Sequence, residues 1–82
     1  MIIKYSNSAK KYIESLDSKT KRRIKQAIDG LPNGDVKVLK GYDDKRKRLR
    51  VGKYRIIYNY ITEREVEILY IMDVDSRGDI YK

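Results

Sequence analysis

Apolar residues in the first third of the chain recur with the spacing of a helix. Two stripes place them at i, i+3, i+4 and i+7, which is one face of a helix. The stripes are Ala9, Tyr12, Ile13 and Leu16, and then Ile24, Ala27, Ile28 and Leu31. Asp17 or Ser18 suits the N-cap of the second helix, and Gly30 suits a C-terminal position with positive φ before Pro32. The pattern predicts an antiparallel helix hairpin after a short strand over residues 2–5.

From residue 46 onward the spacing changes to two, which is the period of a β-strand. Gly52 and Lys53 fit a two-residue hairpin turn, and counting outward from this turn predicts the cross-strand pairs. The predicted pairs are Val51 with Tyr54, Arg50 with Arg55, Leu49 with Ile56, Arg48 with Ile57, Lys47 with Tyr58 and Arg46 with Asn59. One face, with Leu49, Val51, Tyr54, Ile56 and Tyr58, is expected to pack under the helices. We call the opposite face, with Arg46, Arg48, Arg50, Arg55, Ile57 and Asn59, the arginine face.

A second turn is predicted around residues 62–65, where it pairs Ile61 with Val66. Because side chains alternate between the two faces of a strand, the same counting predicts that Leu69 and Ile71 face the core. It sends Ile68, Tyr70 and Met72 to the arginine face beside Ile57. An apolar patch of this kind is rarely left bare, so a partner is expected to cover it. The sequence therefore predicts a single α+β domain over residues 1–82, with an N-terminal strand and an antiparallel two-helix hairpin packed on a mainly antiparallel β-sheet.

Composition narrows the chemistry that the chain can perform. Its 82 residues allow one domain with a small core. Cysteine and histidine are both missing, which excludes disulfides, a thiol nucleophile, the usual zinc ligands and a histidine base. Twenty lysines and arginines against twelve aspartates and glutamates give a net charge of +8, which favours polyanionic partners such as nucleic acid. No apolar run is long enough for a signal peptide or a membrane span, so a cytoplasmic protein is expected.

The basic residues concentrate in the first hairpin. Residues 45–55 carry seven bases and no acid, and Arg50 opposite Arg55 is unfavourable unless an anion lies between them. A solvated basic strand would explain this charge. A phosphate-binding site is the more specific hypothesis, because a guanidinium presents two donors that match phosphate oxygens. The acids that follow, Asp73, Asp75 and Asp79, are expected to be ion-pair partners of nearby arginines rather than metal ligands.

Two motifs in the second half of the chain resemble a known superfamily. The first is Arg48-Leu49-Arg50-Val51-Gly52-Lys53-Tyr54-Arg55-Ile56-Ile57-Tyr58, and the second is Ser76-Arg77-Gly78-Asp79-Ile80-Tyr81. Together with Gly41-Tyr42 and Ile71, they are similar to the RelE/ParE superfamily of toxins from type II toxin–antitoxin modules, although the motifs do not distinguish its branches. The dense arginine face and Tyr81 favour the RelE-like branch. The resemblance covers essentially the whole chain. It implies two helices against an antiparallel sheet and an activity that arrests growth.

The resemblance also implies roles for individual residues. Carried over by position, it gives catalytic roles to Arg48, Arg55, Arg77 and Tyr81. RNA binding is assigned to the bases around them, which are Lys45, Arg46, Lys47, Arg50 and Lys53. Many members have a histidine or another strong base where this chain has Asp75-Ser76. The general base is therefore left open among Lys45, Lys47, Tyr81 and a substrate geometry that presents the hydroxyl in line.

In the RelE-like branch the activity is cleavage of messenger RNA in the ribosomal A site. The resemblance thus implies an endoribonuclease that inhibits translation, needs no metal or cofactor, and acts through the 2′-hydroxyl of its substrate. The alternatives are a ParE-like inhibitor of DNA gyrase and an RNA-binding module that does not cleave. Expected partners are the message, ribosomal RNA and a cognate antitoxin in a hetero-oligomer, with no membrane. The antitoxin is expected on Ile57, Ile68, Tyr70 and Met72, with acidic residues against the arginines.

Overall fold

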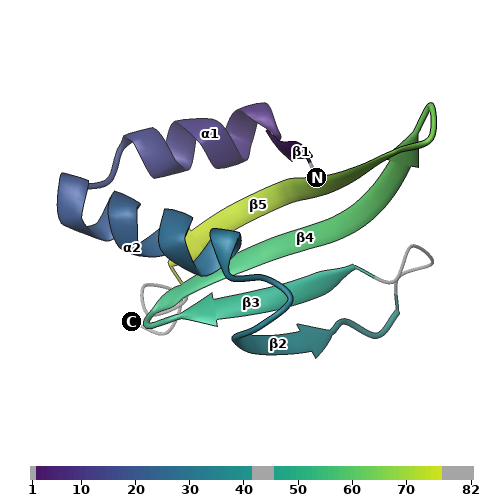
Figure 1. Ribbon diagram of the computed structural model, residues 1–82. Helices are drawn as coiled ribbons and strands as arrows, with labels where there is room; N and C mark the ends of the chain where they lie inside the picture. Colours follow the sequence, from purple (N-terminus) through teal and green to yellow (C-terminus); the bar gives the residue numbers. More distant parts are fainter. Residues whose placement is uncertain (1, 42–45, 77–82) are drawn as a thin grey trace.

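The computed structural model describes residues 2–41 and 46–76, which form two helices on one face of a five-stranded sheet (Figure 1). The elements in chain order are β1 (Ile2–Tyr5), α1 (Asn7–Glu14), α2 (Ser18–Asp29), β2 (Asp35–Val38), β3 (Lys47–Val51), β4 (Tyr54–Glu63) and β5 (Val66–Ser76). The strand order is β1-β5-β4-β3-β2, in which β1 runs parallel to β5 and the other pairs are antiparallel. The predicted fold class is confirmed. The sequence pattern missed β2, because four residues with two valines give too short an alternation.

Both helices begin at a side-chain cap. The hydroxyl of Ser6 accepts the N–H of Ala9 at 3.1 Å, and the carboxylate of Asp17 accepts the N–H of Thr20 at 3.1 Å. Hydrogen bonds from Thr20 hold the pKa of Asp17 below its usual value. The predicted positive φ of Gly30 is wrong, since its φ is −80°. The chain leaves α2 through further tight turns, with the N–H of Leu31 bonded to the carbonyl of Ile28, so no left-handed residue is needed there.

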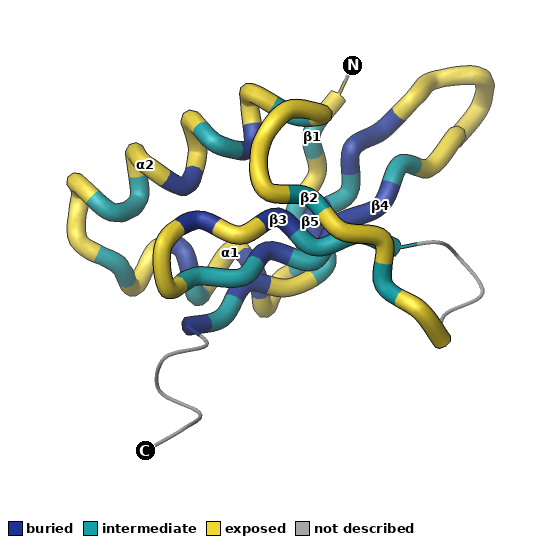
Figure 2. Tube along the Cα trace, turned by 90° about the horizontal axis from the view of Figure 1, so that it is seen from below, coloured by how far each residue is buried: buried dark blue, intermediate teal, exposed yellow. Residues whose placement is uncertain are grey.

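The core lies between the helix hairpin and the sheet. Its helical members are Ala9, Ile13, Ile24 and Ile28, and its sheet members are Leu49, Val51, Ile56, Tyr58, Leu69, Ile71 and Val74. Figure 2 shows these buried stretches in dark blue along the strands and the inner sides of the helices, with yellow exposed turns outside. Tyr5, Tyr12 and Tyr54 surround the core as half-buried aromatic residues. The helices thus cover one sheet face, and the arginine face is the one that they leave uncovered.

The first hairpin forms as predicted. Val51 pairs with Tyr54, and the pairs continue to Lys47 with Tyr58, which confirms the expected register over β3. Gly52 has a φ of +60°, a backbone conformation that residues with a Cβ atom rarely adopt. A Cβ atom at Gly52 would also lie 3.0 Å from the guanidinium of Arg23 in α2.

The second hairpin departs from its predicted register. Glu63 pairs with Val66 across the turn residues Arg64 and Glu65, so the predicted pair of Ile61 with Val66 is wrong by two residues. Arg64 and Glu65 have positive φ of 51° and 66°, which makes this a tight turn of the kind that matches strand twist. Because a shift of two residues preserves the alternation, Leu69 and Ile71 still face the core.

A β-bulge in β5 changes that alternation further along the strand. Tyr58 pairs with Ile71, but Ile57 pairs with Asp73, so Met72 is an extra residue. Beyond the bulge, Val74 packs in the core and Asp75 lies opposite Arg55. A regular ladder would have placed Val74 on the arginine face and the two aspartates toward the core. The bulge therefore brings carboxylates onto the arginine face.

Candidate nucleic-acid interface

A row of four charged residues crosses the arginine face. Asp35 on β2 lies opposite Arg50 on β3, Arg50 opposite Arg55 on β4, and Arg55 opposite Asp75 on β5. The two arginines in the middle are the like-charged pair expected from the sequence. The two aspartates at the ends supply the opposite charge, so the pair does not need an external anion between its members.

Two of the arginines on this face are ion-paired with these carboxylates. Arg55 donates from Nη2 to Oδ2 of Asp75 at 2.8 Å and from Nε to Oδ1 at 3.2 Å. Arg48 donates from Nη2 to Oδ1 of Asp35 at 3.3 Å. The Arg48 side chain is 12% exposed, and its buried Nε has no hydrogen-bond partner within the described part of the chain. Both guanidiniums are thus held in place by neighbouring strands.

An open hollow of about 540 Å³ lies beside this row. Its lining residues are Ser8, Leu39, Lys40, Arg46, Arg55, Ile57, Met72 and Asp73. Leu39 and Lys40 follow β2, Arg46 precedes β3, and Ser8 comes from the start of α1. The hydroxyl of Ser6 donates to the carbonyl of Met72 at 2.7 Å, which fixes the start of α1 against the bulge. The lining of the hollow combines cationic groups from three segments with the apolar residues Leu39, Ile57 and Met72, an arrangement that suits the backbone and bases of RNA.

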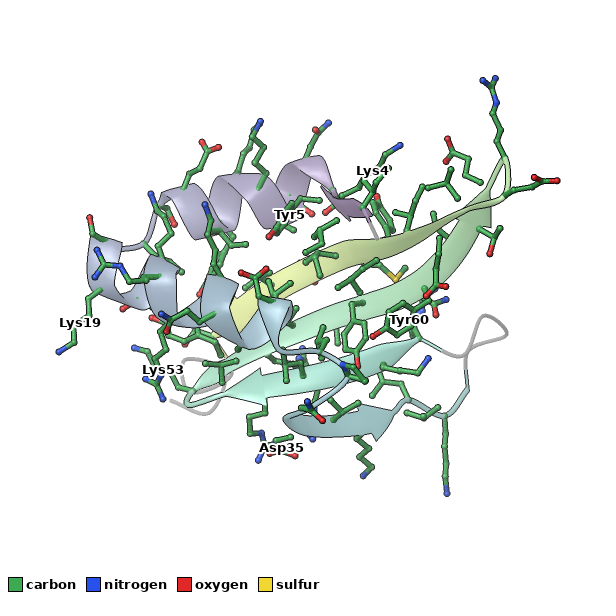
Figure 3. All side chains as sticks on the ribbon, in the orientation of Figure 1. Lys4, Tyr5, Lys19, Asp35, Lys53 and Tyr60 are labelled. Atoms are coloured by element: carbon green, nitrogen blue, oxygen red, sulfur yellow. The ribbon has the colours of Figure 1, made fainter. Side chains whose placement is uncertain are left out.

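The structure divides the predicted RNA-binding residues between two faces. Arg46, Arg48, Arg50 and Arg55 belong to the arginine face or its hollow. The ammonium of Lys47 lies 5.5 Å from the centre of the Tyr60 ring, and that of Lys53 lies 5.6 Å from the Tyr54 ring. Both lysines are therefore on the helix side, and Figure 3 shows Lys53 at the end of β3 near α2. Lys45, Arg77 and Tyr81 lie outside the described residues.

The predicted apolar patch is less accessible than the sequence suggested. Ile57 and Met72 line the hollow and are half-buried, as is Tyr70 opposite Asn59. Ile68 is only 2% exposed, so its side chain is covered within the chain, and its contact with an antitoxin stays a prediction. Ile68 lies on the inner strand β5, and its partners on the neighbouring strands are Ile2 and Ile61, which are 49% and 38% exposed. Ile2, Ile61 and Val66 are exposed apolar residues at that end of the sheet.

Sequence reasoning missed some residues of this face and found others. Asp35, Leu39 and Lys40 were missed together with β2, although Asp35-Val36-Lys37-Val38 does alternate. The expected ion pair between an arginine and one of the late aspartates is confirmed for Asp75. Asp79 lies outside the described residues. Within residues 2–41 and 46–76, no three aspartate or glutamate side chains gather closely enough to hold a metal ion.

A second hollow, of about 420 Å³, lies on the helix side of the molecule. It is lined by Lys4, Tyr5, Lys10, Ile13, Glu14, Lys21 and Lys25. Burial and the nearby carboxylate of Asp29 raise the pKa of the Tyr5 hydroxyl. Figure 3 shows Lys19 on the outer end of the helix hairpin and Asp35 on β2 at the far edge of the sheet. Basic residues line hollows both on the helix side and on the arginine face.

Comparison with known families matches residues 3–81 to the ParE toxin of the type II toxin–antitoxin system, parDE. The chain belongs to this toxin family. The superfamily predicted from the two sequence motifs is thereby confirmed, and the chain is a toxin of the RelE/ParE type from a type II toxin–antitoxin system. A search of curated proteins found no match. Among the described residues of this toxin, no helix is long and apolar enough to cross a membrane.

Solved structures of similar fold come from the same group of toxins. A chain in the archaeal RelE–RelB complex from Pyrococcus horikoshii OT3 is 26% identical over 94% of both chains, with a TM-score of 0.71. One in the RelB–RelE complex from Methanococcus jannaschii is 25% identical over 94% of this chain and 93% of that chain, with a TM-score of 0.67. The YoeB/ParE toxin from Agrobacterium tumefaciens is 16% identical over 93% and 98%, with a TM-score of 0.76, which shows the fold alone.

Proposed function

We propose that this toxin stops translation by cutting messenger RNA in the ribosomal A site through the 2′-hydroxyl of the substrate, without a metal or cofactor. The observation that carries the proposal is the hollow on the arginine face, which is lined by Arg46 and Arg55 together with apolar side chains. Arg48 and Arg50 extend the positive charge along β3. The toxin would act in the cytoplasm, where its substrate is found.

The arginines suit one of the three tasks that this cleavage requires. The reaction takes a proton from the 2′-hydroxyl, stabilises charge on the phosphorane and supplies a proton to the leaving 5′-oxygen. Arg55 and Arg48 are proposed to stabilise the phosphorane, with Arg77 and Tyr81 as further catalytic groups. Because Asp75 and Asp35 already pair with these two arginines, the phosphate of the message must compete with them. A message held by the ribosome competes far better than a free strand, which explains why the toxin would depend on the ribosome.

The remaining basic residues are proposed to bind the message and ribosomal RNA. Arg46 and Arg50 lie on the arginine face and are proposed to bind the message. Lys47 and Lys53 lie on the helix side, so we assign them to ribosomal RNA. Lys45 is proposed to join one of these two groups.

An antitoxin is proposed as the partner that blocks this surface. Two similar structures are complexes of RelE with RelB. A largely disordered segment with apolar and acidic residues would fit Ile57, Tyr70 and Met72 together with the nearby arginines. The exposed Ile2 and Ile61 extend that apolar surface beyond Ile68. Such a segment would cover the hollow and exclude RNA.

Inhibition of DNA gyrase is the second candidate function. Two observations favour it: the matching family is described as the ParE toxin, and both Arg48 and Arg55 are ion-paired within the chain. A gyrase inhibitor needs a binding surface and no nucleophile activation, so it would tolerate arginines with internal partners. This candidate predicts blocked supercoiling with an intact message.

One experiment separates the two candidates. The purified toxin is incubated with ribosomes programmed with a message and an empty A site, with the same RNA free in solution, and with gyrase and relaxed plasmid. Primer extension maps the cut ends. We expect cleavage within the A-site codon, little cleavage of free RNA and normal supercoiling. An intact message together with inhibited supercoiling would replace the first proposal by the second.

A further inference from the structure

Three aspartates of the described chain lie on the arginine face, and they differ in their partners. Asp35 is paired with Arg48, and Asp75 is paired with Arg55 through two hydrogen bonds. Asp73, on β5 opposite Ile57, makes no ion pair within the described residues. It is nevertheless the carboxylate that lines the hollow together with Arg46 and Arg55.

The Asp73 side chain is held in one orientation while remaining open to a ligand. Its Oδ1 accepts the N–H of Val74 at 3.0 Å, and the residue is exposed. The bulge at Met72 determines its position, because the extra residue turns Asp73 away from the core and toward the hollow. A carboxylate fixed by a backbone hydrogen bond at a bulge can act on a ligand without losing much conformational entropy.

We propose that Asp73 is the general base of the cleavage reaction, a role that rests on the proposed ribonuclease function. Arg46 and Arg55 bind the scissile phosphate in the hollow, and Asp73 accepts the proton of the adjacent 2′-hydroxyl. The 2′-oxygen then forms a bond to phosphorus as the bond from phosphorus to the 5′-oxygen breaks. The 5′-oxygen leaves with the electron pair and takes a proton from water, and Asp73 returns its own proton to solvent. The products are a 2′,3′-cyclic phosphate and a 5′-hydroxyl.

The other residues of the hollow suit different tasks. Lys40, Arg46 and Arg55 are cationic and stabilise the phosphate, while Leu39, Ile57 and Met72 are apolar. Both carboxylate oxygens of Asp75 already accept hydrogen bonds from Arg55. The chain has no histidine that could accept the proton. Among the described residues that line the hollow, Asp73 is the carboxylate that can take this role.

The test is single-turnover cleavage on programmed ribosomes with the toxin at saturating and limiting concentrations. Asp73→Asn keeps the shape of the side chain and removes its basicity. We expect the rate at saturation to fall by about 100-fold to 1000-fold, with the half-saturating concentration within about twofold of wild type. Glu67→Gln, which removes one exposed charge from the same strand, is the matched control and should cleave at the wild-type rate. Asp73→Glu should recover part of the lost rate.

Three outcomes would overturn the role. An unchanged saturating rate for Asp73→Asn, or a defect confined to the half-saturating concentration, would mean that Asp73 does not take the proton, while the ribonuclease function stands. A substrate with sulfur in place of the 5′-oxygen makes departure of the leaving group easy. If that substrate restores the rate of Asp73→Asn, the residue assists the leaving group instead. A message left intact by the wild-type toxin would overturn the ribonuclease function itself and this role with it.

Discussion

Arg55 on β4 and Asp75 on β5 form a bidentate ion pair, with nitrogen–oxygen distances of 2.8 Å and 3.2 Å. The pair exists because the bulge at Met72 shifts the register of β5 by one residue. The carboxylate of Asp75 neutralises and aligns the guanidinium of Arg55, one of the two arginines in the middle of the charged row. The same bulge turns Asp73 into the hollow, so one extra residue places both aspartates of β5 on the arginine face.

The first prediction concerns the strength of this ion pair. Both side chains are about one-third exposed, at 30% and 31%, so solvent weakens their attraction. A double-mutant cycle with Arg55→Met and Asp75→Asn should give a coupling free energy of about 0.5–1 kcal/mol. Urea unfolding measures it, and high salt should reduce it. A coupling of zero at low salt would show that the two side chains do not pair in solution.

The second prediction concerns the turn between β4 and β5. Arg64 and Glu65 both adopt positive φ, which costs free energy for any residue with a Cβ atom. Arg64→Asn with Glu65→Gly should raise the free energy of unfolding by about 1 kcal/mol, because asparagine and glycine favour this turn. Thermal or urea unfolding checks the gain. A loss of stability would contradict the turn geometry described for these residues.

The third prediction concerns the buried hydroxyl of Tyr58. The side chain is fully buried and its hydroxyl has no hydrogen-bond partner within the described chain. Tyr58→Phe should therefore leave stability unchanged or raise it by up to about 1 kcal/mol at neutral pH. A loss of more than about 1 kcal/mol on urea unfolding would indicate that the hydroxyl does have a partner.

Alkaline pH provides an independent test of Tyr58. Burial, and to a lesser degree Tyr60, raise the pKa of its hydroxyl to about 12. Because the unfolded chain loses this proton near pH 10, the folded state should lose stability as the pH rises from about 10 to about 12. Tyrosinate absorbance should show a late titration step that Tyr58→Phe removes. Titration of all tyrosines together near pH 10 would contradict this assignment.

The fourth prediction concerns the surface that the antitoxin covers. Hydrogen exchange of the toxin, alone and bound to the antitoxin encoded beside it, should show new protection within residues 55–72. Ile57, Tyr70 and Met72 lie on that face, and their backbone amides report its coverage. Protection confined to α1 and α2 would show that the antitoxin binds the helix hairpin instead.

The sequence predicted the fold because its signals were local. Stripes of apolar residues located both helices, and Gly52 located the turn that fixes the pairing of β3 with β4. The Met72 bulge could not be predicted, since an extra residue is accommodated by contacts with β4 and α1 that no local pattern contains. The partner of Arg48 was hidden for the same reason, because Asp35 lies on the missed strand β2 and is close to Arg48 only through the sheet. The late aspartates were expected to pair with arginines, and Asp75 does so with Arg55. The candidate site was thus predicted in its arginines and in the acidic partner of Arg55, and missed in Asp35 and the rest of β2.

The most direct test of the central claim compares two double variants in cleavage of a message on programmed ribosomes. Arg48→Ala with Arg55→Ala removes two charges from the arginine face, and Lys19→Ala with Arg22→Ala removes two exposed charges from α2 as a control. Circular dichroism confirms that both fold. We predict that the control cuts the A-site codon like wild type, whereas the arginine-face variant loses cleavage by at least about 100-fold. Equal cleavage by both variants would contradict the assignment of the arginine face as the functional surface.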